Sequence, residues 1–202
     1  FLPTGSVSWL YYSDRLTELP LGVFGIAIAT VILPSLSADQ SAARGERFAL
    51  TLDWAVRGVL LIAVPATVAL VMLAQPILIT LFQYGALSPH DVSMAAYSLR
   101  AYALGLCAYM LIKVLAPGFY ARKDMMTPVS IGIRAMLANM VLNVLFVVPL
   151  LFYFNLGHVG LALATSVAAY LNAMLLWRGL LRESVYRFSP AWRAYAGRLS
   201  LA

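Results

Sequence analysis

Residues 9–38, WLYYSDRLTELPLGVFGIAIATVILPSLSA, place three charged side chains and a proline next to a long apolar stretch. The charge-free part, Leu19 to Ala38, matches the roughly 20 residues that an α-helix needs to cross a bilayer. An ionised group at the centre of a membrane helix costs about 2.5–3.5 kcal/mol on insertion scales, so such groups normally face a cavity, a partner or a substrate. The stretch therefore predicts a membrane helix, with Arg15 as a candidate functional residue.

The whole chain has the composition of an integral membrane protein. Of its 202 residues, 62% are hydrophobic and 11% are charged, whereas soluble domains have roughly 45–50% apolar and 25% charged residues. Further charge-free runs cover Gly58–His90, Ala101–Ile112 and Ala135–Trp177. We therefore expect an all-α, multi-pass bundle of membrane helices. The lone Cys107 lies in an apolar run, so it predicts neither a disulfide nor a metal site.

Prolines and capping residues divide the chain into helices. A hydroxyl side chain followed by proline is typical of a helix start, and this pair occurs at Ser88-Pro89, Thr127-Pro128 and Ser189-Pro190. The last pair predicts the start of a sixth helix. The segment Pro76–Tyr84 is too short to cross the membrane and is expected at the interface. The complete spans that we expect are roughly Gly5–Leu36, Leu50–Ala74, Pro89–Tyr120, Pro128–Phe152 and Gly157–Leu181.

Among the connections between these spans, only alternate ones contain basic residues. Short loops rich in Lys and Arg stay in the cytoplasm, so the first span is predicted to run from outside to inside. Most of the net charge of +6 thus serves orientation, and no basic face with interleaved aromatic residues is left to bind nucleic acid. The basic residues follow the first, third and fifth spans, at Arg44, Arg47 and Arg57, at Arg122 and Lys123, and at Arg178, Arg182, Arg187 and Arg193.

The charged cluster of the first span has a defined helical arrangement. Tyr11, Tyr12 and Arg15 recur at three- and four-residue spacing and share one face. Asp14 and Glu18 are four apart on an adjoining face and can partly neutralise Arg15. One interpretation is that these acids only orient a kinked helix around Arg15. The other is that the cation and the two aromatic rings meet a polar headgroup in a cavity.

A proline and further cations extend this pattern. Pro20 lacks the N–H that would bond the Leu16 carbonyl, so a kink is expected there. Arg100 is expected about 16 Å into its helix, near the midplane, where it lines a cavity or bonds carbonyls of a neighbouring helix. Lys113 is expected either to line a cavity or to extend to the interface, and Arg134 to extend to the interface.

Cations therefore outnumber acids within the spans. The cations are Arg15, Arg100, Lys113 and Arg134, and the acids are Asp14 and Glu18. Such a lining favours an anion, and the planar fork of arginine matches phosphate because it can bond two oxygens at once.

Polar and small residues of the last two spans are expected to join helices. Asn139 and Asn143 share a face and are expected to hydrogen-bond to a neighbouring helix, and Gly160, Ala164 and Ala168 form a small-residue stripe for close contact. No nucleotide loop, nucleophile elbow or zinc spacing is present, so we expect neither an enzyme nor a cofactor.

Several motifs together resemble one family. The chain is similar to the MurJ (MviN) family of lipid II flippases along essentially its whole length. The resemblance lies in residues Gly5–Leu16, Glu18–Val23, Leu33–Ser37, Leu81–Gly85, Lys113–Asp124 and Thr127–Val129.

The resemblance implies a fourteen-helix transporter of the multidrug/oligosaccharidyl-lipid/polysaccharide exporter superfamily, with two six-helix lobes around a central cavity. Residues 1–182 would be an incomplete second lobe, from the end of helix seven to helix twelve. Residues 183–202 would be a cytoplasmic connection and the start of helix thirteen. We expect the chain to be a piece of a larger protein whose N-terminal lobe is its partner, together with lipid II and membrane lipids.

Members of this family move the lipid-linked peptidoglycan precursor from the inner to the outer leaflet of the bacterial cytoplasmic membrane by alternating access. Arg15 matches the family's cavity arginine on helix eight, expected to meet the lipid diphosphate, and Lys113 falls at a basic position on helix ten. Asp14 and Glu18 are expected to hold Arg15. The further cavity candidates are Arg100, Asn139 and Asn143. The alternatives are an exporter of another polyprenyl-linked glycan, a cation-coupled drug antiporter, or a membrane scaffold that transports nothing.

Overall fold

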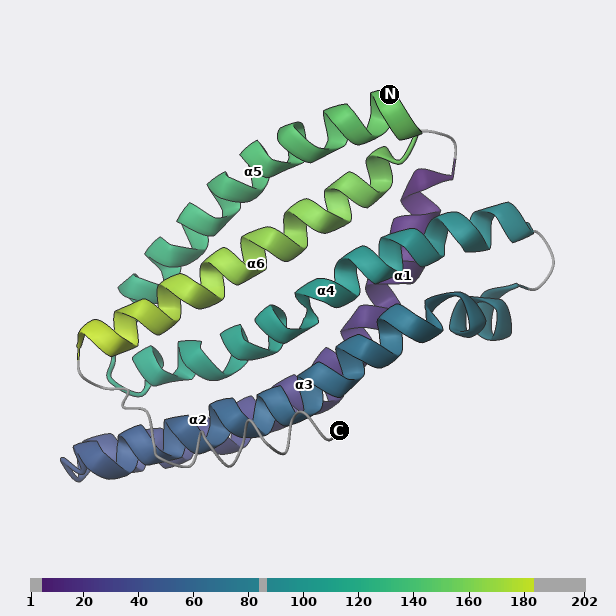
Figure 1. The fold of residues 1–202 in the computed structure, drawn as a ribbon. Coiled ribbons are helices and arrows are strands. Elements are labelled where there is room, and N and C mark those ends of the chain that lie inside the picture. Colours follow the sequence, from purple (N-terminus) through teal and green to yellow (C-terminus); the bar gives the residue numbers. More distant parts are fainter. Residues whose placement is uncertain (1–4, 84–86, 184–202) are drawn as a thin grey trace.

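The computed structural model describes residues 5–83 and 87–183. Within these ranges, five helical segments are long and apolar enough to cross a membrane, which confirms the all-α membrane fold (Figure 1). The first of these segments is continuous over residues 6–41 and comprises α1, a π-helical turn η1, and α2. The elements are α1 Ser6–Pro20, η1 Leu21–Gly25, α2 Ile26–Ser41, α3 Gly45–Phe82, α4 Pro89–Tyr120, α5 Met126–Phe154 and α6 Gly157–Arg182.

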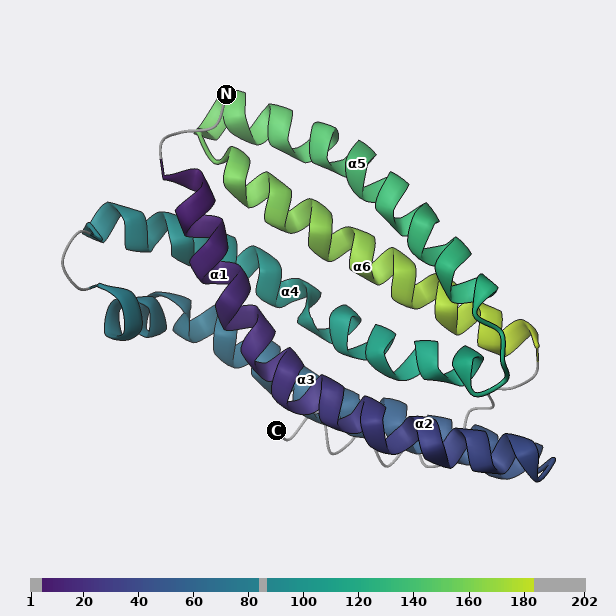
Figure 2. The ribbon, with the colours of Figure 1, turned by 180° about the vertical axis from the view of Figure 1, so that it is seen from behind.

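The helices form a layered bundle whose basic connections lie at one end. Figures 1 and 2 show α4, α6 and α5 side by side, with α2 and α3 running together along α4 and with α1 crossing α4 near its first turns. The α2–α3 connection, the α4–α5 connection and the end of α6 lie at the same end of the bundle (Figure 1). The basic residues of these connections that the structure describes therefore lie at one end of the bundle.

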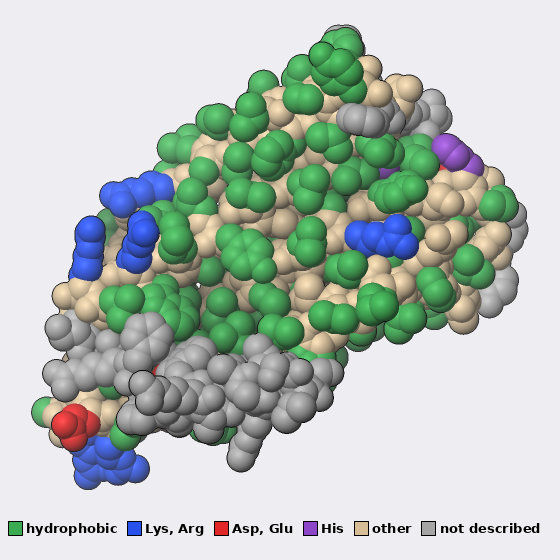
Figure 3. Space-filling model, viewed as in Figure 1, with side chains coloured by type: hydrophobic (Ala, Val, Ile, Leu, Met, Phe, Trp, Pro, Cys, Tyr) green, Lys and Arg blue, Asp and Glu red, His purple; other side chains and the backbone are tan. Residues whose placement is uncertain are grey.

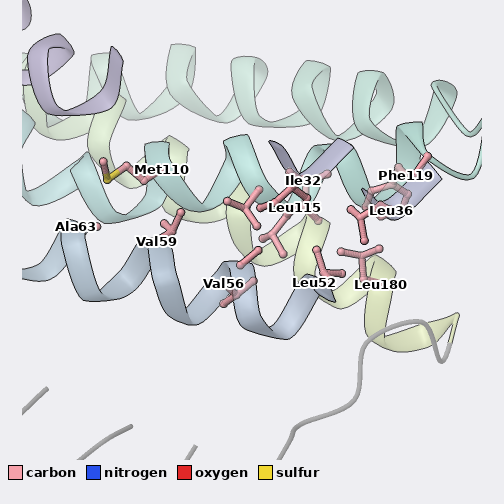
Figure 4. Close-up of a cluster of buried hydrophobic side chains, with 14 of the residues drawn as sticks. Ile32, Leu36, Leu52, Val56, Val59, Ala63, Met110, Leu115, Phe119 and Leu180 are labelled. Atoms are coloured by element: carbon pink, nitrogen blue, oxygen red, sulfur yellow. The ribbon is translucent and has the colours of Figure 1, made fainter. Parts of the chain in front are cut away.

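The core lies where α2, α3, α4 and α6 meet. Figure 4 shows the side chains that fill this junction. Leu36, Leu52 and Leu180 are fully buried there, and Phe119 of α4 is equally inaccessible. Most apolar side chains of α5, in contrast, are exposed on the outside of the bundle. The interior contacts hold α2, α3, α4 and α6 together, while α5 is attached through α6.

The distortion expected at Pro20 is present. The helix continues through Pro20 but widens directly after it into the π-helical turn η1, Leu21–Gly25. A proline removes one backbone donor, and a widened turn is one way in which a helix accommodates the loss. Gly25 is buried in this turn, and a β-carbon built on it would lie 3.8 Å from Cγ of Lys113 in α4. The distortion therefore lies directly against α4.

The prediction of a separate short segment at Pro76–Tyr84 is wrong for residues 76–82. α3 begins at Gly45, earlier than expected, and continues through Pro65 and Pro76 to Phe82, with its last turns bent away from the rest (Figures 1 and 2). Prolines are tolerated in membrane helices when neighbours bond the freed backbone groups. Pro76 frees the carbonyl of Met72, and Nε of Arg100 donates to the neighbouring carbonyl, that of Val71, at 3.2 Å.

The two predicted helix starts within the described residues have different outcomes. Ser88 caps α4 as expected, and its hydroxyl and backbone N–H form a capping box with Asp91. The cap expected at Thr127 is wrong, because α5 begins at Met126 and the Thr127 N–H donates to Oδ1 of Asp124 at 3.0 Å. The start expected at Ser189-Pro190 lies outside the described residues.

The expected close contact of the small-residue stripe is confirmed at its outermost member. A β-carbon on Gly160 of α6 would lie 2.9 Å from Cα of Val147 and 3.0 Å from the backbone of Phe146 in α5. The next members, Ala164 and Ala168, are buried. The two backbones therefore approach each other more closely here than a side chain would allow.

Candidate functional site

One face of α1 is anchored to α4. Nε1 of Trp9 donates to Oδ1 of Asp91 at 2.9 Å, and the Ser13 hydroxyl lies 2.8 Å from the carbonyl oxygen of Ala95. Trp9 is 4% exposed and Ser13 is fully buried. Because successive helix faces are fixed by the 3.6-residue period, anchoring this side turns the opposite face of α1 away from α4.

The face turned away carries Arg15. Nη1 of Arg15 pairs with Oε2 of Glu18 at 2.9 Å, and the guanidinium lies over the Tyr11 ring, 5.0 Å from its centroid. Both charged side chains are more than half exposed, Arg15 by 58% and Glu18 by 52%. A guanidinium has five N–H donors, so pairing with one carboxylate oxygen leaves donors of Arg15 for another group. This open, aromatic-backed cation is the centre of the candidate site.

The other expected supporting residues do not contact the Arg15 guanidinium. Asp14 is exposed, and within the described residues it forms no ion pair with Arg15. The Tyr12 ring packs against Phe82 at the end of α3, with 4.7 Å between ring centroids. Of the two expected acids, Glu18 makes the direct contact with Arg15.

Lys113 lies in a separate groove between α2 and α4. The groove has a volume of about 430 Å³ and is lined by apolar residues of α2, by Thr30, and by Lys113 and Tyr120 of α4. Lys113 is exposed and lies beside Gly25, ten residues beyond Arg15 along the α1–α2 span. At about 1.5 Å per residue the two cations are about 15 Å apart along the helix. The structure places them at different depths and does not join them in one cluster.

Arg100 belongs to the contact between α3 and α4. Its Nε donates to the Val71 carbonyl, and its guanidinium lies 5.8 Å from the centroid of the Tyr97 ring. This is the second of the two arrangements expected from the sequence. The geometry connects Arg100 with the bent end of α3 and not with Arg15.

Asn139 and Asn143 line an open groove of about 520 Å³ bounded by α4, α5 and α6. Nδ2 of Asn143 donates to Oδ1 of Asn139 at 2.7 Å. The expected hydrogen bond to a neighbouring helix is therefore replaced by one within α5, between residues one turn apart. Thr165 and Asn172 of α6 bring further polar groups to the same groove.

Trp9, Ser13 and Asp91 are residues of this region that sequence reasoning missed. Trp9 and Ser13 are four residues apart on α1, a spacing that places them on one helical face, and they bond Asp91 and the backbone of α4. The four-residue spacing was the signal available in the sequence. In residues 5–83 and 87–183, no group of three His, Cys, Asp or Glu side chains is placed to hold a metal ion.

The exposed guanidinium of Arg15, on an apolar helix, can therefore bind an anion. The model of the family described as "Lipid II flippase MurJ" matches residues 1–202. The chain belongs to the MurJ family. This confirms the family expected from the sequence motifs, and with the five apolar helices it makes the chain part of a multi-pass membrane protein of a flippase family.

Relatives within the MurJ family match the chain along nearly its whole length. A protein of Vibrio cholerae named "Probable lipid II flippase MurJ" is 53% identical over 202 residues, which are 100% of this chain and 37% of the relative. "Lipid II flippase MurJ" of Burkholderia cenocepacia is 43% identical over 191 residues, 95% of this chain and 36% of the relative. The chain thus spans little more than a third of these relatives.

A solved structure agrees with the helix arrangement. The chain resembles "Lipid II flippase MurJ, inward closed conformation" with a TM-score of 0.80 and 28% sequence identity. The match covers 97% of this chain and 38% of that one. The five-span bundle is therefore an arrangement that occurs inside a larger MurJ family protein.

Proposed function

We propose that the full-length protein flips lipid II from the inner to the outer leaflet of the bacterial cytoplasmic membrane by alternating access. The relatives and the solved structure carry the name lipid II flippase, and the chain covers only part of each. In this proposal residues 1–182 supply the second lobe of the transporter and residues 183–202 lead towards the next helix. The N-terminal lobe of the same protein forms the other wall of the cavity.

Arg15 is proposed to bind the diphosphate of lipid II. The observation that carries this role is the half-exposed guanidinium on an apolar span, paired with a single carboxylate and backed by the Tyr11 ring. Arg15 lies within an apolar helical segment, residues 6–41, that is long enough to cross a membrane. An arginine there is costly without an anion, and a diphosphate offers oxygens in the geometry that a guanidinium bonds bidentately.

Glu18 and Tyr11 are proposed to hold the guanidinium in place between transport cycles. The Glu18 carboxylate offsets part of the charge while the cavity contains no substrate, and the ring face of Tyr11 limits the rotamers of Arg15. Lys113, about 15 Å further towards the basic end, is proposed to meet the headgroup nearer the inner leaflet. Two cations at different depths suit a charged group that moves across the membrane.

Substitution of Arg15 in the full-length protein tests this proposal. In cells that depend on this protein for lipid II export, Arg15→Ala should abolish the appearance of lipid II in the outer leaflet while folded protein remains in the membrane. Arg44→Ala, at an exposed arginine of the α2–α3 connection, is the control and should export normally. Normal export by the Arg15 variant would refute the role, and lost export with equally lost folded protein would favour a scaffold.

A further inference from the structure

A second cationic groove lies at the basic end of the bundle, between α5 and α6. It has a volume of about 430 Å³, and three arginines line it, Arg134 from α5 with Arg178 and Arg182 from α6. Ser130 adds a hydroxyl and Leu175 contributes apolar surface. Figure 3 shows Lys and Arg side chains gathered where α5 begins and α6 ends, next to a largely apolar surface.

The spacing of these residues places them on the faces of α5 and α6 that line the groove. Arg178 and Arg182 are four apart and share a face of α6, and Ser130 and Arg134 are four apart on α5. All three arginines are exposed. Within the part of the chain that the structure describes, none of them forms an ion pair with a carboxylate. Three like charges that face one groove repel each other, so the groove favours an anion.

The chain nearby does not supply that anion. Asp124, close in sequence, accepts a hydrogen bond from the N–H of Thr127, one of the lining residues, and a single carboxylate does not offset three arginines. Glu183 is paired with Arg122. The sequence after Glu183 contains Arg187, Arg193 and Arg198 and no further acid.

The position of the groove indicates the source of the anion. It lies at the end that carries the basic connections, where the positive-inside rule places the cytoplasmic surface and its anionic lipids. Directly along α5 from the groove, Val129, Ile133 and Leu137 are exposed by 54%, 51% and 54%. A phosphate held by the arginines would leave acyl chains free to lie along these side chains.

We propose that this groove binds the phosphate of an anionic glycerophospholipid from the cytoplasmic leaflet, through Arg134, Arg178 and Arg182. The ligand chemistry is a phosphodiester with attached acyl chains, distinct from the lipid diphosphate assigned to Arg15. The site is defined by binding, so it stands or falls independently of the proposed transport.

Native mass spectrometry of the full-length protein, titrated with phosphatidylglycerol, tests the site. Arg134→Gln, Arg178→Gln and Arg182→Gln should each weaken binding about fivefold, and the triple variant about a hundredfold, as expected for the loss of about 1 kcal/mol per basic residue. The single variants preserve most of the surface charge, so their effect is measurable even if the triple variant is unstable.

The matched control removes three cations from the same end of the bundle outside the groove. Arg44→Gln, Arg47→Gln and Lys123→Gln, combined, should leave phosphatidylglycerol binding within about twofold of the unsubstituted protein. An equal loss in this control would overturn the proposal in favour of general surface attraction. Tighter binding of inorganic phosphate than of phosphatidylglycerol, or binding only of lipid diphosphate at these arginines, would overturn the assignment to a phospholipid.

Discussion

Replacing Gly160 with alanine tests the close approach of α5 and α6. The new β-carbon would lie 2.9 Å from Cα of Val147 and 3.0 Å from backbone atoms of Phe146. Because these are main-chain atoms, relief requires one helix to move, and overpacking of this kind typically costs about 1–3 kcal/mol. Alanine also favours helix over glycine by up to about 1 kcal/mol, so a matched glycine is needed to separate the two effects.

Gly58 provides that match, because a β-carbon on it meets no other heavy atom within 4 Å. Gly58→Ala should leave the full-length protein equally or more stable, and Gly160→Ala should be less stable than Gly58→Ala by about 1–3 kcal/mol. Equilibrium unfolding of both variants in the same detergent measures the difference. Equal stability of the two variants would show that α5 and α6 are not in close contact at Gly160.

Two smaller predictions concern the ends of helices. Trp9→Phe removes the donor to Asp91 while keeping an aromatic ring, and should lower the free energy of unfolding by about 1–3 kcal/mol; an unchanged free energy would contradict the anchoring of α1 on α4. The hydrogen bonds from the Thr127 side chain and backbone hold the pKa of Asp124 below its ordinary value. The ionised Asp124 therefore stabilises the folded protein fully when the pH is above that ordinary value, and this stabilisation is lost as the pH falls through the lowered pKa. Asp124→Ala should therefore cost about 1 kcal/mol at neutral pH and progressively less in acid, whereas a pH-independent difference from the unsubstituted protein would exclude this cap.

The spans could be predicted because their causes are local. Apolar runs, a capping serine before Pro89 and a proline at position 20 define the helices and the distortion in the first of them. The continuation of α3 through Pro76 could not be predicted in this way. It depends on packing, and a neighbouring side chain, Arg100, bonds the backbone just before the bend. The cap of α5 was misplaced because Asp124 and Thr127 are both good capping residues and only the backbone geometry decides between them.

The candidate site could be predicted only in part for the same reason. The cost of a charge in an apolar span identifies Arg15, and the sequence offered both Asp14 and Glu18 as its partners, of which the structure pairs Glu18 with it. The rotation of each helix about its axis is set by its neighbours. The sequence therefore did not show that Trp9 and Ser13 face α4.

Equilibrium binding of lipid II to the full-length protein tests the role of Arg15 most directly. Loss of even one charge-assisted hydrogen bond, worth about 1.5–3 kcal/mol, should weaken binding by about tenfold to a hundredfold in Arg15→Ala, and loss of a bidentate pair by more. Arg15→Lys should be intermediate, because an ammonium keeps the charge without the planar fork. Unchanged affinity in Arg15→Ala, with Arg44→Ala as the control, would contradict diphosphate recognition by Arg15.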